Sequence, residues 1–247
     1  MKKLLFWPYQ IYAWLVLIPL AAMLSFIAGW LATLTAILVS PRFSSRYVAM
    51  NWARALAWLT PMRVQLEGSE HIDTSRSYVV VANHLSLFDI PALYGWLDLD
   101  LKWVIKQELR KAPGIGIGCE KVGHIFIDRK NPEQARKQIN AALERLGNGI
   151  GILFFPEGTR SPDGNLLPFK KGAFRVAIEA QIPILPVTVV GTHEICPAKT
   201  LKIFPGRVRL VAHPVIETQG RSLNDLGSLR DTAQTLIASA LPTAETT

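Results

Sequence analysis

An α/β fold is predicted for this chain: a mixed, mostly buried β-sheet flanked by helices, with an N-terminal membrane-attachment helical segment. From Arg63 onward, short β-rich runs alternate with segments of helical periodicity, which is typical of a sheet covered by helices. Before that point lies an apolar stretch in which no charged residue occurs between Lys3 and Arg42. These two compositions divide the chain into a membrane-associated helical segment, residues 1–61, and a globular domain, residues 62–247.

The composition narrows the class of partner. Of the 247 residues, 49% are hydrophobic, and the formal net charge is +8. A basic protein is attracted to nucleic acid or anionic lipid, and the apolar segment beside lysine and arginine favours an anionic membrane surface. No zinc-binding or helix-turn-helix spacing supports a nucleic-acid partner. The two cysteines, Cys119 and Cys196, have no second ligand at metal-binding spacing, so we expect reduced thiols, a cytoplasmic compartment and no metal.

The apolar segment is longer than the core of a signal peptide, which spans about 7–15 residues, so we expect it to be retained. As one helix from Leu4 to Ser40 it would be roughly 55 Å long, against about 30 Å for the hydrocarbon core of a bilayer. It must therefore tilt, project or break, and Pro19 and Gly29 are the candidate break points. Because basic residues flank both of its ends, a single tilted span and a re-entrant hairpin both remain open.

Helical periodicity continues beyond the apolar segment. Tyr47–Leu59 has apolar residues at roughly helical spacing and ends before Pro61. It fits an interfacial helix with Trp52 and Trp58 at the membrane surface, and equally a core helix of the domain. Another helix is predicted after Asn131, whose side chain can cap it. Two more are predicted over Gly172–Ala180 and Ser222–Leu241.

Seven strands are predicted in the domain. Several are continuous apolar runs, as expected of strands that are buried on both faces. Their ranges are Arg63–Glu67, Tyr78–Ala82, Trp103–Ile105, Ile125–Ile127, Ile150–Phe155, Ile184–Val190 and Val208–Val211.

The first segment with chemical potential is Asn83–Asp89, directly after a predicted strand. Around a straight helix, His84 and Asp89 would lie about 140° apart, so they meet only if His84 lies in the turn and Asp89 begins the next helix. Asp89 would then accept a hydrogen bond from one ring nitrogen, leaving the other to take a proton from a substrate hydroxyl. Ser86 is too close in the chain to face His84 readily, and no Gly-x-Ser-x-Gly elbow is present, so we treat it as structural.

A second polar segment, Phe155–Ser161, also follows a buried strand. Its Glu157 can hold a substrate hydroxyl, and Arg160 can bind a phosphate through two hydrogen bonds. A simple turn with a surface arginine fits the spacing equally well.

Two further segments follow the same logic. Gly123–Arg129 ends a strand in Asp128 and Arg129, which offers a second phosphate ligand, although such a pair is usually a solvated salt bridge. In Ile182–Val187 two prolines bracket an apolar turn. That turn could line an apolar slot, and a buried strand entry is the commoner explanation.

In this order and spacing, the four segments resemble the glycerolipid acyltransferase family, whose members carry Asn-His-x4-Asp, Gly-x-x-Phe-Ile-Asp-Arg, Phe-Pro-Glu-Gly-Thr-Arg-Ser and a proline-bracketed fourth block. The resemblance covers about residues 63–214 and is closest to the bacterial 1-acylglycerol-3-phosphate acyltransferases. It implies His84 as general base and Asp89 as its partner. It further implies a set of acceptor-binding residues: Arg129, Glu157, Gly158, Thr159, Arg160 and, unless it is a solvated surface lysine, Lys106. The same resemblance places Ile182, Pro183 and Pro186 at the acyl site.

The resemblance implies an O-acyltransferase that moves an acyl group from a thioester to the free hydroxyl of lysophosphatidic acid, giving phosphatidic acid in phospholipid biosynthesis. The donor is acyl-CoA or an acyl carrier protein thioester, and the transfer is direct, with no cofactor and no covalent acyl-enzyme. The catalytic domain is expected on the cytoplasmic face of the cytoplasmic membrane. Acylation of another lyso-lipid, such as a lyso-ornithine lipid or lysophosphatidylglycerol, and lipid binding without catalysis are the alternatives.

Overall fold

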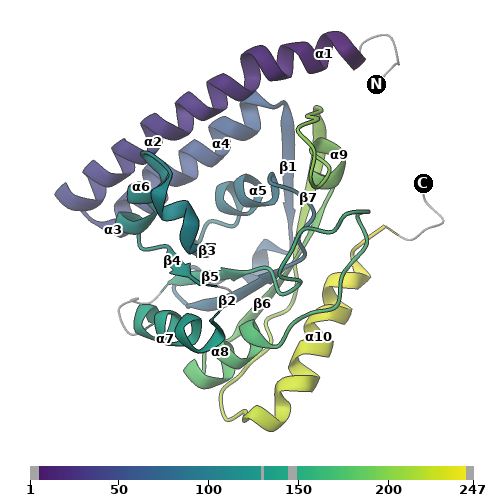
Figure 1. Ribbon diagram of the computed structural model, residues 1–247. Coiled ribbons are helices and arrows are strands. Elements are labelled where there is room, and N and C mark those ends of the chain that lie inside the picture. The colour runs from purple at the N-terminus through teal and green to yellow at the C-terminus, as the bar shows by residue number, and fades with distance from the viewer. Residues whose placement is uncertain (1–5, 129–130, 144–148, 243–247) are drawn as a thin grey trace.

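The computed structural model describes residues 6–128, 131–143 and 149–242. At its centre is a seven-stranded sheet with the order β1-β7-β6-β2-β5-β3-β4 (Figure 1). The strands are β1 (Met62–Glu67), β2 (Tyr78–Ala82), β3 (Asp100–Lys106), β4 (Ile125–Ile127), β5 (Ile150–Phe154), β6 (Ile184–Val190) and β7 (Gly206–Ala212). All seven predicted strands are confirmed, and β3 differs most in its limits because it begins three residues before the prediction.

The direction of the strands determines where a site can form. β4, β3, β5, β2 and β6 are parallel, whereas β7 is antiparallel to β6 and β1 runs parallel to β7. The carboxyl ends of the five parallel strands therefore lie at one edge of the sheet. In open α/β sheets, ligands bind outside this edge.

Helices cover both faces of the sheet (Figure 1). The longer ones are α4 (Met50–Leu59), α5 (Asp89–Trp96), α6 (Ile115–Val122), α7 (Pro132–Leu143), α8 (Gly172–Ala180) and α10 (Leu226–Ser239), and the shorter ones are α3 (Pro41–Phe43) and α9 (Thr192–Ile195). The core of one face includes residues of α4 and α5, and the core of the other includes residues of α7, α8 and α10. The side chain of Asn131 accepts the Gln134 N–H at 3.1 Å, which confirms the predicted cap of α7.

The helix over 47–59 belongs to the core. Met50, Ala53 and Ala57 are buried in the cluster that also holds α5, whereas Trp58 is 83% exposed. Of the two alternatives, the core helix is therefore the one that the structure adopts. Residues 50–59, which the predicted boundary assigns to the N-terminal segment, pack into the domain.

The apolar segment forms one helix, Phe6–Leu38, made of α1 (Phe6–Tyr12), a π-helical turn (Ala13–Leu17) and α2 (Ile18–Leu38). It does not break at Pro19 or Gly29. Pro19 lies in the first turn of α2, and the wide turn before it accommodates a residue without an N–H. The chain reverses only after Leu38, where Ser40 accepts the Phe43 N–H at 3.1 Å and caps α3.

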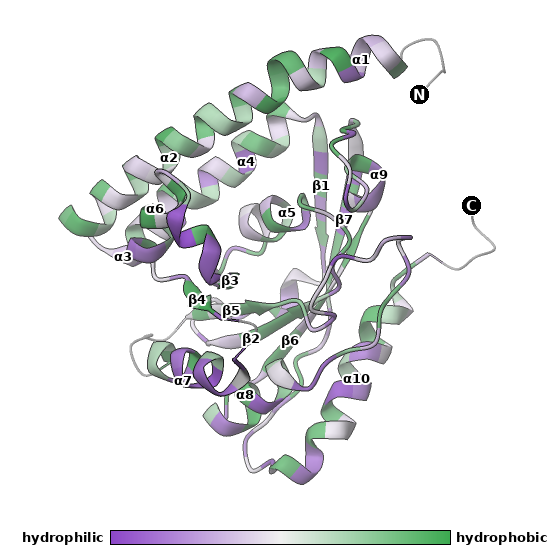
Figure 2. Cartoon of the chain, viewed as in Figure 1, coloured by the Kyte–Doolittle hydropathy of each residue, from purple (hydrophilic) through white to green (hydrophobic). Residues whose placement is uncertain are grey.

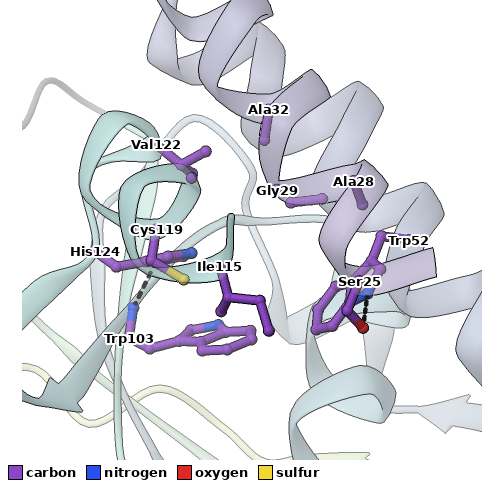
Figure 3. Close-up of a pocket in the computed structure, with 12 residues that line it drawn as sticks. Ser25, Ala28, Gly29, Ala32, Trp52, Trp103, Ile115, Cys119, Val122 and His124 are labelled. Atoms are coloured by element: carbon purple, nitrogen blue, oxygen red, sulfur yellow. Dashed lines mark hydrogen bonds between the residues drawn. The ribbon is translucent and has the colours of Figure 1, made fainter. Parts of the chain in front are cut away.

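Glycines set the close contact between α2 and α6. A Cβ built on Gly29 would lie 2.5 Å from the carbonyl oxygen of Gly114, and one built on Gly118 would lie 2.7 Å from that of Gly29. Beside this contact is an apolar cavity of about 60 Å³, lined by residues of α2, α4, α6 and β3 (Figure 3). There Trp52 Nε1 donates to Ser25 Oγ at 3.0 Å and fixes α4 against α2.

We predict that Gly118→Ala weakens the packing of α2 on the domain. Its new methyl group would clash with backbone atoms, which cannot move away as a flexible side chain can. We therefore expect the free energy of unfolding to fall by about 1–3 kcal/mol, equivalent to several degrees in Tm. Gly227→Ala in α10 is the matched control, because a Cβ there has no atom within 4 Å. Thermal unfolding in detergent measures both, and an equal Tm for the two variants would contradict the packing argument.

Candidate active site

His84 and Asp89 meet at the carboxyl end of β2. His84 lies in the turn after the strand, and Asp89 is the first residue of α5. The Nδ1 of His84 is 2.7 Å from Oδ2 of Asp89. Within the described residues, Nε2 of His84 has no hydrogen-bond partner and the side chain is 17% exposed, so this nitrogen remains accessible to a substrate hydroxyl.

Asp89 is fully buried, and both of its carboxylate oxygens accept hydrogen bonds. Its Oδ2 also accepts the N–H groups of Leu85 at 2.7 Å and Ser86 at 2.9 Å. Its Oδ1 accepts the hydroxyl of Thr192, the first residue of α9, which follows β6. These donors stabilise the buried charge and hold the carboxylate against the imidazole.

Neighbouring polar residues fix the turn that carries His84. The Asn83 amide bridges to β6, donating to the carbonyl oxygen of Val189 at 2.8 Å and accepting its N–H at 2.7 Å. Ser86 donates its hydroxyl to the carbonyl oxygen of Cys196 at 2.8 Å. Ser86 is therefore turned away from the imidazole and plays the structural part expected of it.

Glu157 lies directly beneath the same turn and is 3% exposed. Its Oε1 accepts the backbone N–H of His84 at 2.7 Å, and its Oε2 accepts that of Leu167 at 3.0 Å. The Ser161 N–H, in turn, donates to the carbonyl oxygen of His84 at 2.8 Å. One carboxylate oxygen thus positions the backbone of His84 and the other holds Leu167, and the expected contact of Glu157 with the acceptor stays a prediction.

We expect Glu157 to make the stability of the fold depend on pH. Burial raises its pKa from about 4.5 to about 7, although two backbone N–H groups lower it. Between these two values the folded protein keeps a proton that the unfolded chain releases, so stability falls as the pH rises through this window.

Glu157→Gln removes this titration. Wild-type Tm should therefore fall relative to the variant as the pH is raised from about 5 to about 8, by the equivalent of about 1–3 kcal/mol. Thermal unfolding of both proteins over a pH series measures the difference, and a difference that stays constant across the series would contradict the assignment.

The turn that contains Glu157 brings an aromatic ring onto the base. Gly158 adopts a left-handed conformation (φ 75°) that favours glycine, and its N–H donates to the carbonyl oxygen of Phe155 at 3.0 Å, closing a tight turn. The Phe155 ring stacks on the imidazole of His84, with centroids 3.9 Å apart. Thr159 is exposed and Arg160 is half-buried near Cys196.

The remaining predicted residues differ in their placement. Lys106 is exposed at the carboxyl end of β3, where it pairs in register with Ile127 of β4. Arg129 lies outside the described residues. Pro183 and Ile182 precede β6 at the opposite edge of the sheet, roughly 20 Å from the level of His84 along the strand, since Val79 of β2 pairs with Ile184.

Pro186 lies inside β6, paired with Val81, and is buried. The acyl-site role of Ile182, Pro183 and Pro186 therefore stays a prediction, without a contact to His84. Thr192 is the residue that sequence reasoning missed. It follows Gly191 at the end of a predicted strand. Polar residues after three other predicted strands are candidate site residues, and the same criterion includes Thr192.

The two cysteines and the histidines outside the dyad make no second site. Burial raises the pKa of the Cys119 thiol to about 12 and lowers that of His124 to about 3, so both are held neutral. In the ranges that the structure describes, no three His, Cys, Asp or Glu side chains are arranged to hold a metal ion.

Known proteins are similar to this chain in sequence. The 1-acyl-sn-glycerol-3-phosphate acyltransferase alpha of Ovis aries is 33% identical over 177 residues, which is 71% of this chain and 62% of the relative. The 1-acyl-sn-glycerol-3-phosphate acyltransferase of Pseudomonas aeruginosa is 29% identical over 222 residues, covering 88% of this chain and 85% of that one. This chain spans about three fifths of the length of the mammalian relatives it matches.

A solved structure and a family model extend the comparison. The crystal structure of the 1-acyl-sn-glycerophosphate (LPA) acyltransferase PlsC from Thermotoga maritima superimposes with a TM-score of 0.70 at 28% identity, covering 90% of this chain and 95% of that one. The family model described as Acyltransferase matches residues 63–190, just over half of the chain, and that match contains His84, Asp89 and Glu157. The protein therefore belongs to the acyltransferase family.

Proposed function

We propose that this protein transfers an acyl group from an acyl thioester to the free hydroxyl of lysophosphatidic acid, forming phosphatidic acid. The observation that carries the proposal is the dyad: Asp89 holds Nδ1 of His84 while Nε2 stays accessible at the ligand-binding edge of the sheet. A protein that only binds lipid needs no base. The names of the relatives from Ovis aries and Pseudomonas aeruginosa support the choice of acceptor.

The reaction follows from this arrangement. Nε2 of His84 takes the proton of the acceptor hydroxyl as its oxygen attacks the thioester carbonyl carbon. The C–S bond then breaks, an ester forms, and the imidazolium returns its proton to the departing sulfur. The carboxylate of Asp89 fixes the tautomer and stabilises the imidazolium between the two steps.

Cations at the same edge suit a phosphorylated acceptor. Arg160 follows the Phe155–Gly158 turn in the chain. Lys106 is the last residue of β3, which is two strands from β2 in the sheet. We propose that they bind the acceptor phosphate, and that Arg129, which follows β4 in the sequence, adds to them. Thr159, which is exposed and precedes Arg160 in the chain, is a further candidate to contact the acceptor.

We also propose that the long helix attaches the protein to a membrane by lying along its surface. In the described part of the chain, Phe6–Leu38 is the one helix long and apolar enough to cross a membrane, and 11% of its most apolar stretch is buried. Its outer face is apolar (Figure 2) and exposes large side chains, among them Trp7, Leu15, Met23, Ile27, Trp30 and Ile37. Such a face fits the acyl-chain boundary of a bilayer.

The inner face of that helix is bound to the domain along its length. Gln10 donates to the carbonyl oxygen of Ile203 at 2.8 Å, and Gly29 lies against Gly118. A helix held side-on by a charged domain favours a position along the membrane surface over an upright crossing of the bilayer. This arrangement would bring the site close to substrates that reside in the membrane. We propose that the catalytic domain lies on the cytoplasmic face of the cytoplasmic membrane.

The test is acyl transfer by the purified, detergent-solubilised protein. Acyl-CoA and an acylated carrier protein serve as donors, and lysophosphatidic acid, lysophosphatidylglycerol and a lyso-ornithine lipid serve as acceptors. We expect the formation of phosphatidic acid, detected by mass spectrometry. In a separate test of the membrane proposal, we expect the protein to co-float with vesicles that contain anionic lipid. Activity on another lyso-lipid alone would replace the acceptor, and no product with any pair would end the enzyme proposal.

A further inference from the structure

A second cavity opens beside the dyad. Its volume is about 620 Å³, within the range of small-molecule sites. It lies between α7 and α8, over the ends of the central strands, and the Phe155–Gly158 turn forms one wall. Its floor is apolar and includes Val104, Ile127, Ile139, Phe154 and Val176.

Three cations and one carboxylate are among the described residues that line this cavity, and the carboxylate, Glu133, pairs with Lys137 at 3.4 Å. Arg136 and Arg175 line it, and both lie close to Glu179, at 3.5 Å and 4.0 Å. Lys170 also lines it, and no carboxylate of the described residues lies within 4 Å of its ammonium group. An unpaired cation above an apolar floor suits an amphiphile with an anionic head.

The backbone holds Lys170 in place. Its N–H donates to the carbonyl oxygen of Pro156 at 2.9 Å, and the residue before it, Phe169, is buried. The end of its side chain lies over Gly158: a Cβ built on that glycine would be 2.6 Å from Nζ. A side chain at position 158 would therefore displace the ammonium group, in addition to straining the turn.

This position is close to the base. The turn that joins Phe155 to Gly158 keeps their Cα atoms within about 7 Å, and the Phe155 ring stacks on His84. Arg160, by contrast, lies towards Cys196. Lys170 and Arg160 thus both lie near the loop that positions His84.

We propose that Lys170 binds the phosphate of the lysolipid acceptor and contributes to the preference for it. This inference rests on the proposed function and names a further ligand in the same site. In lysophosphatidic acid, two carbons separate the phosphate from the reacting hydroxyl, so an anion held near His84 is within its reach. In a thioester donor, the whole pantetheine arm separates the phosphates from the reacting carbonyl.

Lys170→Met removes the charge and keeps the length of the side chain, and Lys171→Met is the matched control on the adjacent exposed residue. We expect Lys170→Met to raise the KM for lysophosphatidic acid by about 10–100-fold, while kcat and the KM for the donor change less than threefold. Lys171→Met should keep wild-type values, and Lys170→Arg should recover most of the lost affinity.

The outcomes separate the proposals. A structural role for Lys170 would lower kcat or Tm without a selective change in the acceptor KM, and this would overturn the inference. So would equal KM values for the two methionine variants, or a rise confined to the donor KM. In each of these cases the wild type still makes phosphatidic acid, and the proposed function stands. A wild type that acylates no lysophosphatidic acid would end both.

Discussion

His84→Ala should lower kcat by about 10²–10⁴-fold while leaving the protein folded. An alcohol is a weak nucleophile. The two carboxylates beside the imidazole, Asp89 and Glu157, are buried and accept backbone N–H groups, so we expect neither to replace it. Asp89 loses the imidazole but keeps its two backbone N–H donors and the Thr192 hydroxyl, so the buried carboxylate stays hydrogen-bonded. The KM values for donor and acceptor should change little, because the interactions that bind them lie elsewhere in the site.

The measurement is steady-state transfer to lysophosphatidic acid, with the Tm of each variant as a check on folding. His71→Ala is the control, because His71 follows β1, whose carboxyl end lies at the opposite edge of the sheet. Turnover by His84→Ala at the wild-type rate would exclude the imidazole as the base. A loss shared by His71→Ala would point to instability instead.

Much of the fold could be predicted because buried strands are local signals. A run such as Tyr-Val-Val-Val-Ala in β2 is apolar at every position, and all five residues are buried. The helix α6 could not be predicted, because Ile-Gly-Ile-Gly contains two poor helix formers. Gly118 is explained only by the α2 backbone that lies against it, a contact between segments 89 positions apart, and Gly116 by the backbone of Leu109 and Arg110.

The same limit applies to the site. The contact between His84 and Asp89 follows from five residues of chain and a strand-to-helix turn, so local reasoning reached it. The roles of Glu157 and Thr192 depend on strand order, because β5 and β6 are the two neighbours of β2. Glu157 is 73 residues from His84, and Thr192 is 103 residues from Asp89. A polar residue at the end of a strand can be identified from the sequence as a candidate site residue. Whether it contacts the substrate or another site residue depends on the order of the strands in the sheet.

Asp89→Asn should test the dyad more finely than Asp89→Ala. An asparagine carbonyl oxygen in the place of Oδ2 still accepts the Leu85 and Ser86 N–H groups, and its amide can donate to the Thr192 hydroxyl, which also accepts. The fold and the tautomer of His84 should therefore survive. What the variant lacks is the negative charge that stabilises the imidazolium, so kcat should fall by about 100-fold or more.

Asp89→Ala removes the acceptor altogether. Its buried N–H donors would be left unsatisfied, each at a cost of about 1–3 kcal/mol, so this variant should lose stability as well as activity. Comparing kcat and Tm for the two variants separates charge from hydrogen bonding. Wild-type turnover in Asp89→Asn would show that the carboxylate charge is not used in catalysis, and a Tm as low as that of Asp89→Ala would contradict the hydrogen-bond assignment. Only a normal Tm with a low kcat agrees with a carboxylate that acts through His84.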